Sequence, residues 1–343
     1  MTLVELMVAV VLFSVVMTGL IELLVSNSKN AMATSSLSRI QETGRTAVQL
    51  LTNDIRRAGY LGGNIGLDIT GSLGEATPSN TCPSDNTYGT MVRQPVAGLN
   101  DHDPFTINAS FDCITNATPP PVGPLRGEYL RGDVITLRFA SSLAVKPDDM
   151  ISTRPYIRTS LVEGTIFEGK DAVDDFEGEG AEDAEDAEDA EETNNLLSDP
   201  TSRNYALVAH TYYVGSSGRS CQGPALPDSD DPDDWPVPAL FRKSISDTGV
   251  PTAPQELLAG VEHLQFKYQV GNQYVDANAV TDWADVGAIE TTILVRTECP
   301  ETGFTNDRTF AIGDLASEYG PTDGYRRQVF TIVTSVRNHK GST

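Results

Sequence analysis

The sequence predicts an α+β protein in which one long N-terminal helix packs on an antiparallel β-sheet head with long loops. Two observations carry this prediction. An apolar run at the N-terminus continues into a helical pattern that contains no proline as far as Arg57, and stretches with strand-like alternation follow after Gly132. These stretches do not alternate with helical segments of about 10–15 residues, which argues against a doubly wound parallel sheet.

The first element is an uncharged apolar run from Leu6 to Ile21, LMVAVVLFSVVMTGLI. With its flanks it reaches about 20 residues, the length that crosses the hydrocarbon core of a bilayer. We therefore expect residues 1–26 to form a transmembrane helix. A secretory signal peptide is the competing interpretation, because Ala31 and Ala33 have cleavage-site spacing, but no basic residue precedes the run. The first basic residue is Lys29, so charge leaves the orientation open.

Two carboxylates interrupt or border this apolar segment, Glu5 and Glu22. Glu22 falls near the far interface, whereas Glu5 lies four residues, about 6 Å at helical rise, inside the start. An acidic side chain at bilayer depth costs about 2.5–3.5 kcal/mol on insertion scales, so it usually has a partner or a function. The alternative is that the side chain of Glu5 merely extends to the interface.

The second element is the amphipathic continuation of the same helix over residues 27–60. Its apolar positions recur at spacings of mostly three and four, and we expect this stripe to lie against a sheet. The helix is expected to end near Gly59 and to measure roughly 85 Å. The stripe consists of Leu37, Ile40, Gly44, Ala47, Val48, Leu51 and Ile55.

The remaining chain, residues 61–343, is expected to form the β-rich head. Proline, glycine and small polar residues dominate up to Gly132, which indicates loops. Later stretches are rich in β-branched and aromatic residues and predict strands. The predicted strands are Asp133–Phe139, Tyr205–Val214, Leu264–Val270, Ala288–Thr297 and Gln328–Val336.

The cysteines indicate an oxidising compartment. Cys82, Cys113, Cys221 and Cys299 are an even number with neither CxxC nor zinc-like spacing. Four cysteines allow three connectivities, and the sequential one, Cys82 with Cys113 and Cys221 with Cys299, is favoured.

The chain is strongly acidic, with a formal net charge of −24, and this excludes nucleic acid as a plausible partner. Residues 170–195 form an acidic low-complexity insertion with an Ala-Glu-Asp repeat. We interpret it as a solvated surface insertion; the alternative is a cation-binding or spacer arm. A second cluster, with Asp228, Asp230, Asp231 and Asp233, is a weak calcium candidate without EF-hand spacing. No other cofactor is predicted.

Catalysis is not predicted. His102, His210, His263 and His339 belong to no metal-binding pattern, and the sequence contains no nucleophile or phosphate-binding motif. Each histidine is interpreted as a surface or strand residue.

The opening MTLVELMVAVVLFSVV resembles the mature N-terminus of type IV pilins and secretion pseudopilins, with Glu5 at the position of their fifth-residue glutamate. Most members begin with phenylalanine, so Met1 is a departure. Four further stretches resemble PilW-type minor pilins: RIQETGRTAVQLLTNDIRRAGYLGG, RGDVITLRF, LLAGVEHLQFKY and YRRQVFTIVTSVRN. The region from about Glu163 to Pro238 shows little of this pattern.

The resemblance implies a pilin fold and a role in assembly. Prepilin peptidase is expected to cleave before Met1 and to methylate its amine, and Glu5 is expected to pair with the N-terminal amine of a neighbouring subunit. The implied partners are other major and minor pilins and the inner-membrane assembly machinery. The implied location is the inner membrane, single-pass with the head in the periplasm, and then an extracellular filament.

The function expected on this basis is that of a minor pilin, in the filament or in its initiation or tip complex. A J-type pseudopilin of a type II secretion system shares the same plan and is the first alternative. A surface-displayed adhesin and a membrane-tethered enzyme are further alternatives. Twitching motility and cell adhesion are the expected activities of the filament.

Overall fold

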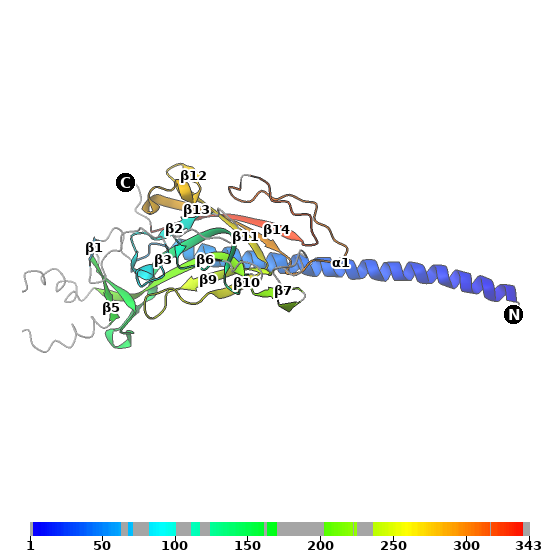
Figure 1. Ribbon diagram of the computed structural model, residues 1–343, viewed down its shortest axis with the longest axis horizontal. Coiled ribbons are helices and arrows are strands. Elements are labelled where there is room, and N and C mark those ends of the chain that lie inside the picture. Colours follow the sequence, from blue (N-terminus) through cyan, green and yellow to red (C-terminus); the bar gives the residue numbers. More distant parts are fainter. Residues whose placement is uncertain are drawn as a thin grey trace, which may run out of the picture.

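Figure 1 shows a long helix that projects far beyond a β-rich head. The computed structural model describes residues 3–62, 68–70, 82–100, 111–116, 124–160, 163–169, 202–221, 223–224, 236–315 and 317–338. The order of elements, helix first and strands afterwards, confirms the predicted α+β class.

The helix α1 runs without a break over Leu3–Arg57, as predicted, and at 1.5 Å per residue measures roughly 82 Å. It ends because Gly59 adopts a left-handed conformation with φ of 76°, which suits glycine at a helix C-terminus. The side-chain amide of Asn338 then donates to the carbonyl of Ala58 at 3.2 Å. The far end of the chain thus caps the helix.

The head contains a large mixed sheet in which eight strands take part. Its main path runs β1-β5-β4-β6-β3-β2, while β9 pairs with β6 and β10 pairs with β9. All pairs are antiparallel except β1 with β5. The strands are β1 Asp68–Thr70, β2 Val96–Leu99, β3 Tyr129–Val145, β4 Pro155–Thr159, β5 Glu163–Glu168, β6 Arg203–Ser216, β9 Pro238–Ser244 and β10 Gln255–Ala259.

A second sheet is antiparallel and four-stranded, in the order β12-β11-β13-β14. Its strands are β11 Val261–Val270, β12 Gln273–Val275, β13 Val286–Arg296 and β14 Arg327–Ser335. A short hairpin joins β7 Arg219–Ser220 to β8 Gly223–Pro224. Short helical turns complete the head: α2 Thr87–Thr90, η2 Pro147–Asp149, η4 Ala277–Ala279 and η5 Trp283–Asp285.

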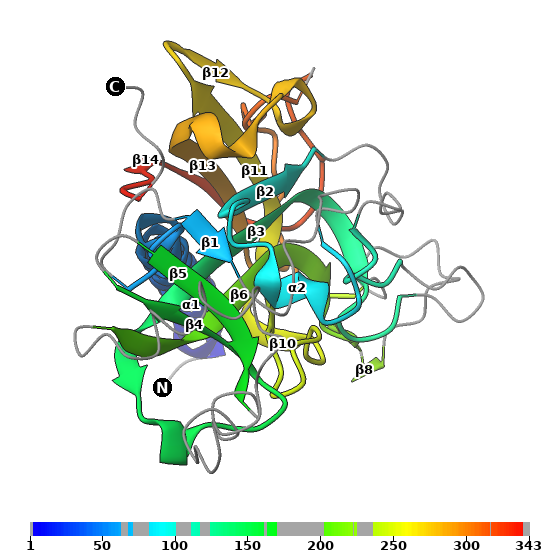
Figure 2. The same cartoon turned by 90° about the vertical axis from the view of Figure 1, so that its left-hand side faces the viewer.

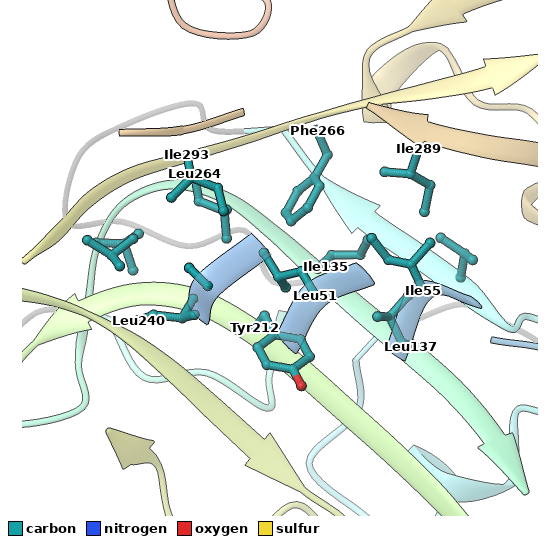
Figure 3. Close-up of a cluster of buried hydrophobic side chains, with 14 of the residues drawn as sticks. Leu51, Ile55, Ile135, Leu137, Tyr212, Leu240, Leu264, Phe266, Ile289 and Ile293 are labelled. Carbon is teal, nitrogen blue, oxygen red and sulfur yellow. The ribbon is translucent and has the colours of Figure 1, made fainter. Parts of the chain in front are cut away.

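The main core lies where α1 meets both sheets. Figure 2 shows α1 almost end-on, with the four-stranded sheet on one side and strands of the large sheet on the other. In Figure 3, Leu51 and Ile55 of α1 lie between Leu264 and Ile289 of the small sheet and Leu137 of β3. Burial of such side chains contributes about 1.5–3 kcal/mol each, so α1 is an integral part of the head's core.

All five predicted strands are present, as parts of β3, β6, β11, β13 and β14. The stripe of α1 lies against β-sheet, as predicted, and the structure adds that α1 packs between two sheets. Leu37 was wrongly included in the buried stripe: it is 41% exposed, and the first buried residue of the helix is Ile40.

A buried arginine fixes the loop that carries α2. Arg138 of β3 is fully enclosed and donates to the carbonyls of Tyr88 at 2.8 Å and Gln94 at 3.1 Å. Burial lowers the pKa of Arg138 to about 10, which still leaves it charged at neutral pH. The guanidinium therefore satisfies backbone carbonyls that the short helix cannot satisfy itself.

Candidate assembly interface

The N-terminal part of α1 is the most exposed apolar surface of the described chain. Between Leu3 and Val25 every Leu, Val, Ile, Met and Phe side chain is exposed, from 44% at Met17 to 77% at Leu3. Exposed patches of this size mark surfaces that contact a membrane or another protein. We call residues 3–25 the apolar segment.

The apolar segment can span a membrane by length and composition. At helical rise it measures roughly 35 Å, compared with about 30 Å for the hydrocarbon core of a bilayer. No described part of the head covers it, since none of its apolar window is buried. This is the behaviour expected of a segment whose surroundings are lipid or neighbouring helices rather than its own fold.

The hydroxyl groups in the apolar segment are satisfied within the helix. Ser14 donates to the carbonyl of Val11 at 2.8 Å, and Thr18 donates to the carbonyl of Ser14 at 2.9 Å. Unsatisfied polar groups are costly in a hydrocarbon environment, so these local bonds make the segment compatible with lipid or a dry helix bundle. Gly19 leaves open space on the helix surface, where another chain could approach closely.

Glu5 is the acidic residue of the first turn of α1 and is solvent-exposed. A carboxylate in this position interacts favourably with the positive end of the helix dipole. Met1, the expected site of methylation, lies outside the described residues. The expected pairing of Glu5 with a neighbouring amine thus remains a prediction.

A polar cluster joins the C-terminal end of α1 to the large sheet. Asp54 Oδ2 accepts a hydrogen bond from Tyr212 Oη at 2.6 Å. The same oxygen lies 2.5 Å from His210 Nδ1. Burial acts to raise the pKa of Asp54, but His210 and Tyr212 outweigh it, so the pKa lies below its ordinary value. Arg57 stacks on Phe139 beside this cluster, 4.4 Å from the ring centroid.

The sequence analysis did not predict the contact of Asp54 with β6, although one signal was available. Asp54 lies three residues after Leu51 and one before Ile55, so the helical spacing alone would have placed it near the buried stripe. His210 was correctly predicted to be a strand residue. The alternation of side chains along β6 could not show that the ring of His210 contacts Asp54.

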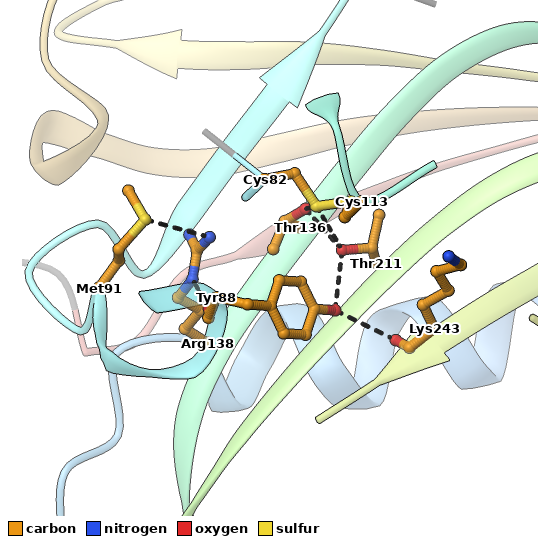
Figure 4. Close-up of a disulfide and its surroundings, with 8 residues drawn as sticks. All are labelled: Cys82, Tyr88, Met91, Cys113, Thr136, Arg138, Thr211 and Lys243. Atoms are coloured by element: carbon orange, nitrogen blue, oxygen red, sulfur yellow. Dashed lines mark hydrogen bonds between the residues drawn. A yellow bond between two sulfur atoms is a disulfide. The ribbon is translucent and has the colours of Figure 1, made fainter. Parts of the chain in front are cut away.

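The structure joins Cys82 to Cys113 and Cys221 to Cys299, with Cα atoms 5.4 and 5.5 Å apart. The first disulfide is buried, and Figure 4 shows it beside Thr136, Thr211 and Tyr88. Thr211 Oγ1 lies 3.3 Å from Cys82 Sγ and 3.0 Å from Tyr88 Oη.

The second disulfide lies at the surface, because Cys299 is exposed. It links the end of the β7 region to the segment that follows β13. The two bridges therefore differ strongly in their access to solvent.

The remaining candidates fall partly outside the described residues. The acidic insertion 170–195, the calcium candidates Asp228, Asp230, Asp231 and Asp233, and the histidines His102 and His339 all lie there. Within the described ranges, no group of three or more His, Cys, Asp or Glu side chains could hold a metal ion. His263 is buried and its ring contacts that of Tyr319, with centroids 5.9 Å apart.

Comparison with known proteins finds a similarity in the C-terminal part of the head. Residues 211–338 match the family model of the type IV pilus-assembly protein W. A type IV-like pilin from Thermus thermophilus aligns with 61% of this chain and 79% of its own, at 13% identity and a TM-score of 0.28. No curated protein matched the chain. The family match confirms the predicted resemblance to PilW-type proteins over residues 211–338.

Proposed function

We propose that this PilW-type, pilin-like protein is a minor pilin that enters a type IV pilus, or its initiation or tip complex, through the apolar segment. The observation that carries the proposal is the continuity of α1. One helix without a break connects an uncovered apolar surface to the core of the head. A simple membrane anchor does not need so rigid a connection, whereas a filament subunit does, because its head must be held at a fixed height.

The energetics of the apolar segment suit transfer from membrane to filament. Lipid tails and neighbouring apolar helices are about equally favourable surroundings for Leu, Val and Phe, so moving between them has no large hydrophobic cost. The same property means that apolar burial alone cannot fix which height one helix takes against another. A polar contact at a defined position is needed for register.

Glu5 supplies that contact in the proposed mechanism. Its carboxylate pairs with the N-terminal amine of a neighbouring subunit, and Met1 is the mature, N-methylated residue left by prepilin peptidase. In a low-dielectric bundle an unpaired charge is expensive, so a shift of register is penalised. Before assembly, the proposed state is a single-pass inner-membrane protein with its disulfide-bonded head in the periplasm and with other pilins and the assembly machinery as partners.

Deletion of the gene and complementation with the wild-type gene test this function. Loss of surface pili and of twitching motility is the expected result. Loss of exoprotein secretion with normal pili would instead identify a J-type pseudopilin. Normal pili with lost attachment, in a variant lacking residues 170–195, would identify an adhesin. Mass spectrometry of the purified protein is expected to find a methylated Met1 at the mature N-terminus.

A further inference from the structure

A cavity in the head collects arginine side chains in an otherwise acidic protein. It has a volume of about 160 Å³ and lies where β3, β11, β13 and β14 meet the segment before β14. Its charged lining consists of Arg131, Glu262, Arg296, Asp323 and Arg327. The proposed assembly through the apolar segment makes no use of it.

Arg327 is already neutralised in this cavity. Its guanidinium donates to Glu262 Oε2 at 2.6 Å and to Asp323 Oδ1 at 2.6 Å, and its side chain is 1% exposed. Burial acts to raise the pKa of Glu262, but Arg296 and Arg327 outweigh it and hold the pKa at about 2. Glu262 is therefore a carboxylate at neutral pH, and Arg327 forms ion pairs with both acids of the cavity.

Arg131 and Arg296 are less well satisfied. Arg131 Nη1 donates to Tyr319 Oη at 3.0 Å, and Arg131 forms no ion pair among the described residues. Arg296 reaches Glu262 at the long distance of 3.5 Å and stacks on Tyr325. Within the described ranges, the Nε atoms of Arg131 and Arg296 are buried without a hydrogen-bond partner.

The charges of the cavity do not balance. Three arginines face two carboxylates, which leaves one positive charge in excess. A buried guanidinium donor without a partner is costly, and guanidinium groups match the geometry of oxyanions. The volume of about 160 Å³ is well above the roughly 10–15 Å³ that one water molecule needs, so a small oxyanion fits.

We propose that this cavity binds one oxyanion group, held by Arg131 and Arg296. A free inorganic oxyanion such as sulfate has this chemistry.

The experiment is isothermal titration of sulfate into the full-length protein in detergent micelles, with chloride replaced by sulfate at constant ionic strength. We expect saturable binding at one site. Arg131→Gln should weaken it at least tenfold, and Arg131→Lys, which keeps the charge but not the planar fork, should weaken it less. Arg126→Gln is the matched control, because Arg126 pairs with Glu256 on the surface. Circular dichroism checks that each variant is folded.

The proposal is overturned if sulfate gives no saturable heat with the wild-type protein. It is equally overturned if folded Arg131→Gln binds sulfate as the wild type does.

Discussion

Tyr212 of β6 donates its hydroxyl to Asp54 of α1 at 2.6 Å, and this buried bond ties the long helix to the large sheet. Burial and the neighbouring Asp54 raise the pKa of Tyr212 well above its ordinary value, so the hydroxyl remains a donor at all physiological pH values. The helix is thus fixed to the head by a specific polar contact as well as by apolar packing.

Tyr212→Phe is expected to destabilise the protein by about 1–3 kcal/mol, because it removes a donor from a buried carboxylate. The free energy of unfolding in denaturant, measured on the detergent-solubilised protein, checks this. Tyr274→Phe is the control, since Tyr274 is 42% exposed and should change stability by less than about 0.5 kcal/mol. Equal effects of the two substitutions would contradict the account.

Gly44 allows Phe330 of β14 to lie directly on the helix. A Cβ atom added at Gly44 would collide with the Phe330 ring, whereas one added at Gly19 meets nothing within 4 Å. Gly44→Ala is therefore expected to lower thermal stability by about 1–3 kcal/mol. Gly19→Ala should be neutral or slightly stabilising through helix propensity. The double variant Gly44→Ala/Phe330→Leu has a smaller side chain facing the helix and should recover part of the lost stability. If the double variant is as unstable as Gly44→Ala, the contact with Phe330 is not the cause.

His263 should make the head sensitive to mild acid. Burial lowers its pKa to about 4, whereas the unfolded chain has an ordinary histidine pKa of about 6.5. The unfolded state thus binds the proton more readily, so stability is complete above about pH 6.5 and is lost as the pH falls towards 4. The expected loss at pH 5 is about 2 kcal/mol.

His263→Gln should flatten this dependence between pH 4.5 and 7, as followed by unfolding curves at each pH. Asp54 and Glu262 do not account for the same window. Their pKa values are lowered, so their contributions are lost at more acidic pH. A wild-type and a His263→Gln protein with parallel pH profiles would refute the assignment.

The two disulfides should differ in their rate of reduction under native conditions. Cys82 and Cys113 are buried, at 0% and 2% exposure, whereas Cys299 is exposed. Since thiol exchange needs access to a sulfur atom, dithiothreitol should reduce the Cys221–Cys299 bridge first. Alkylation followed by mass spectrometry of peptides measures the order. Simultaneous labelling of all four cysteines in folded protein would contradict it.

Much of the fold follows from local pattern. The limits of α1 and the strands β3, β6, β11, β13 and β14 were readable, because apolar residues recur at helical spacing in α1 and β-branched and aromatic residues are enriched in the strands. Strands such as β4, PYIRT, and β9, PALFRKS, were not, since proline and basic residues interrupt the alternation there. The division into two sheets was unreadable because it depends on pairing between distant strands.

The candidate sites also divide into those that the sequence could predict and those that it could not. Glu5 was recognisable because a carboxylate in an apolar run has no local explanation. Asp54 was signalled only by its spacing from the buried stripe. Arg138 and the ion pair of Glu262 with Arg327 gave no signal, since each is a charge satisfied by residues from other elements. Arg327 meets Glu262 across 65 positions of sequence, a distance over which no spacing rule applies.

The incorporation of Glu5 variants into filaments tests the central claim most directly. We would compare Glu5→Gln with Glu22→Gln, whose carboxylate lies at the other end of the apolar segment, and measure the fraction of each protein in sheared filaments relative to its level in the membrane. The account predicts at least a tenfold lower filament fraction for Glu5→Gln, with an unchanged membrane level and near wild-type incorporation of Glu22→Gln. Wild-type incorporation of Glu5→Gln would contradict it.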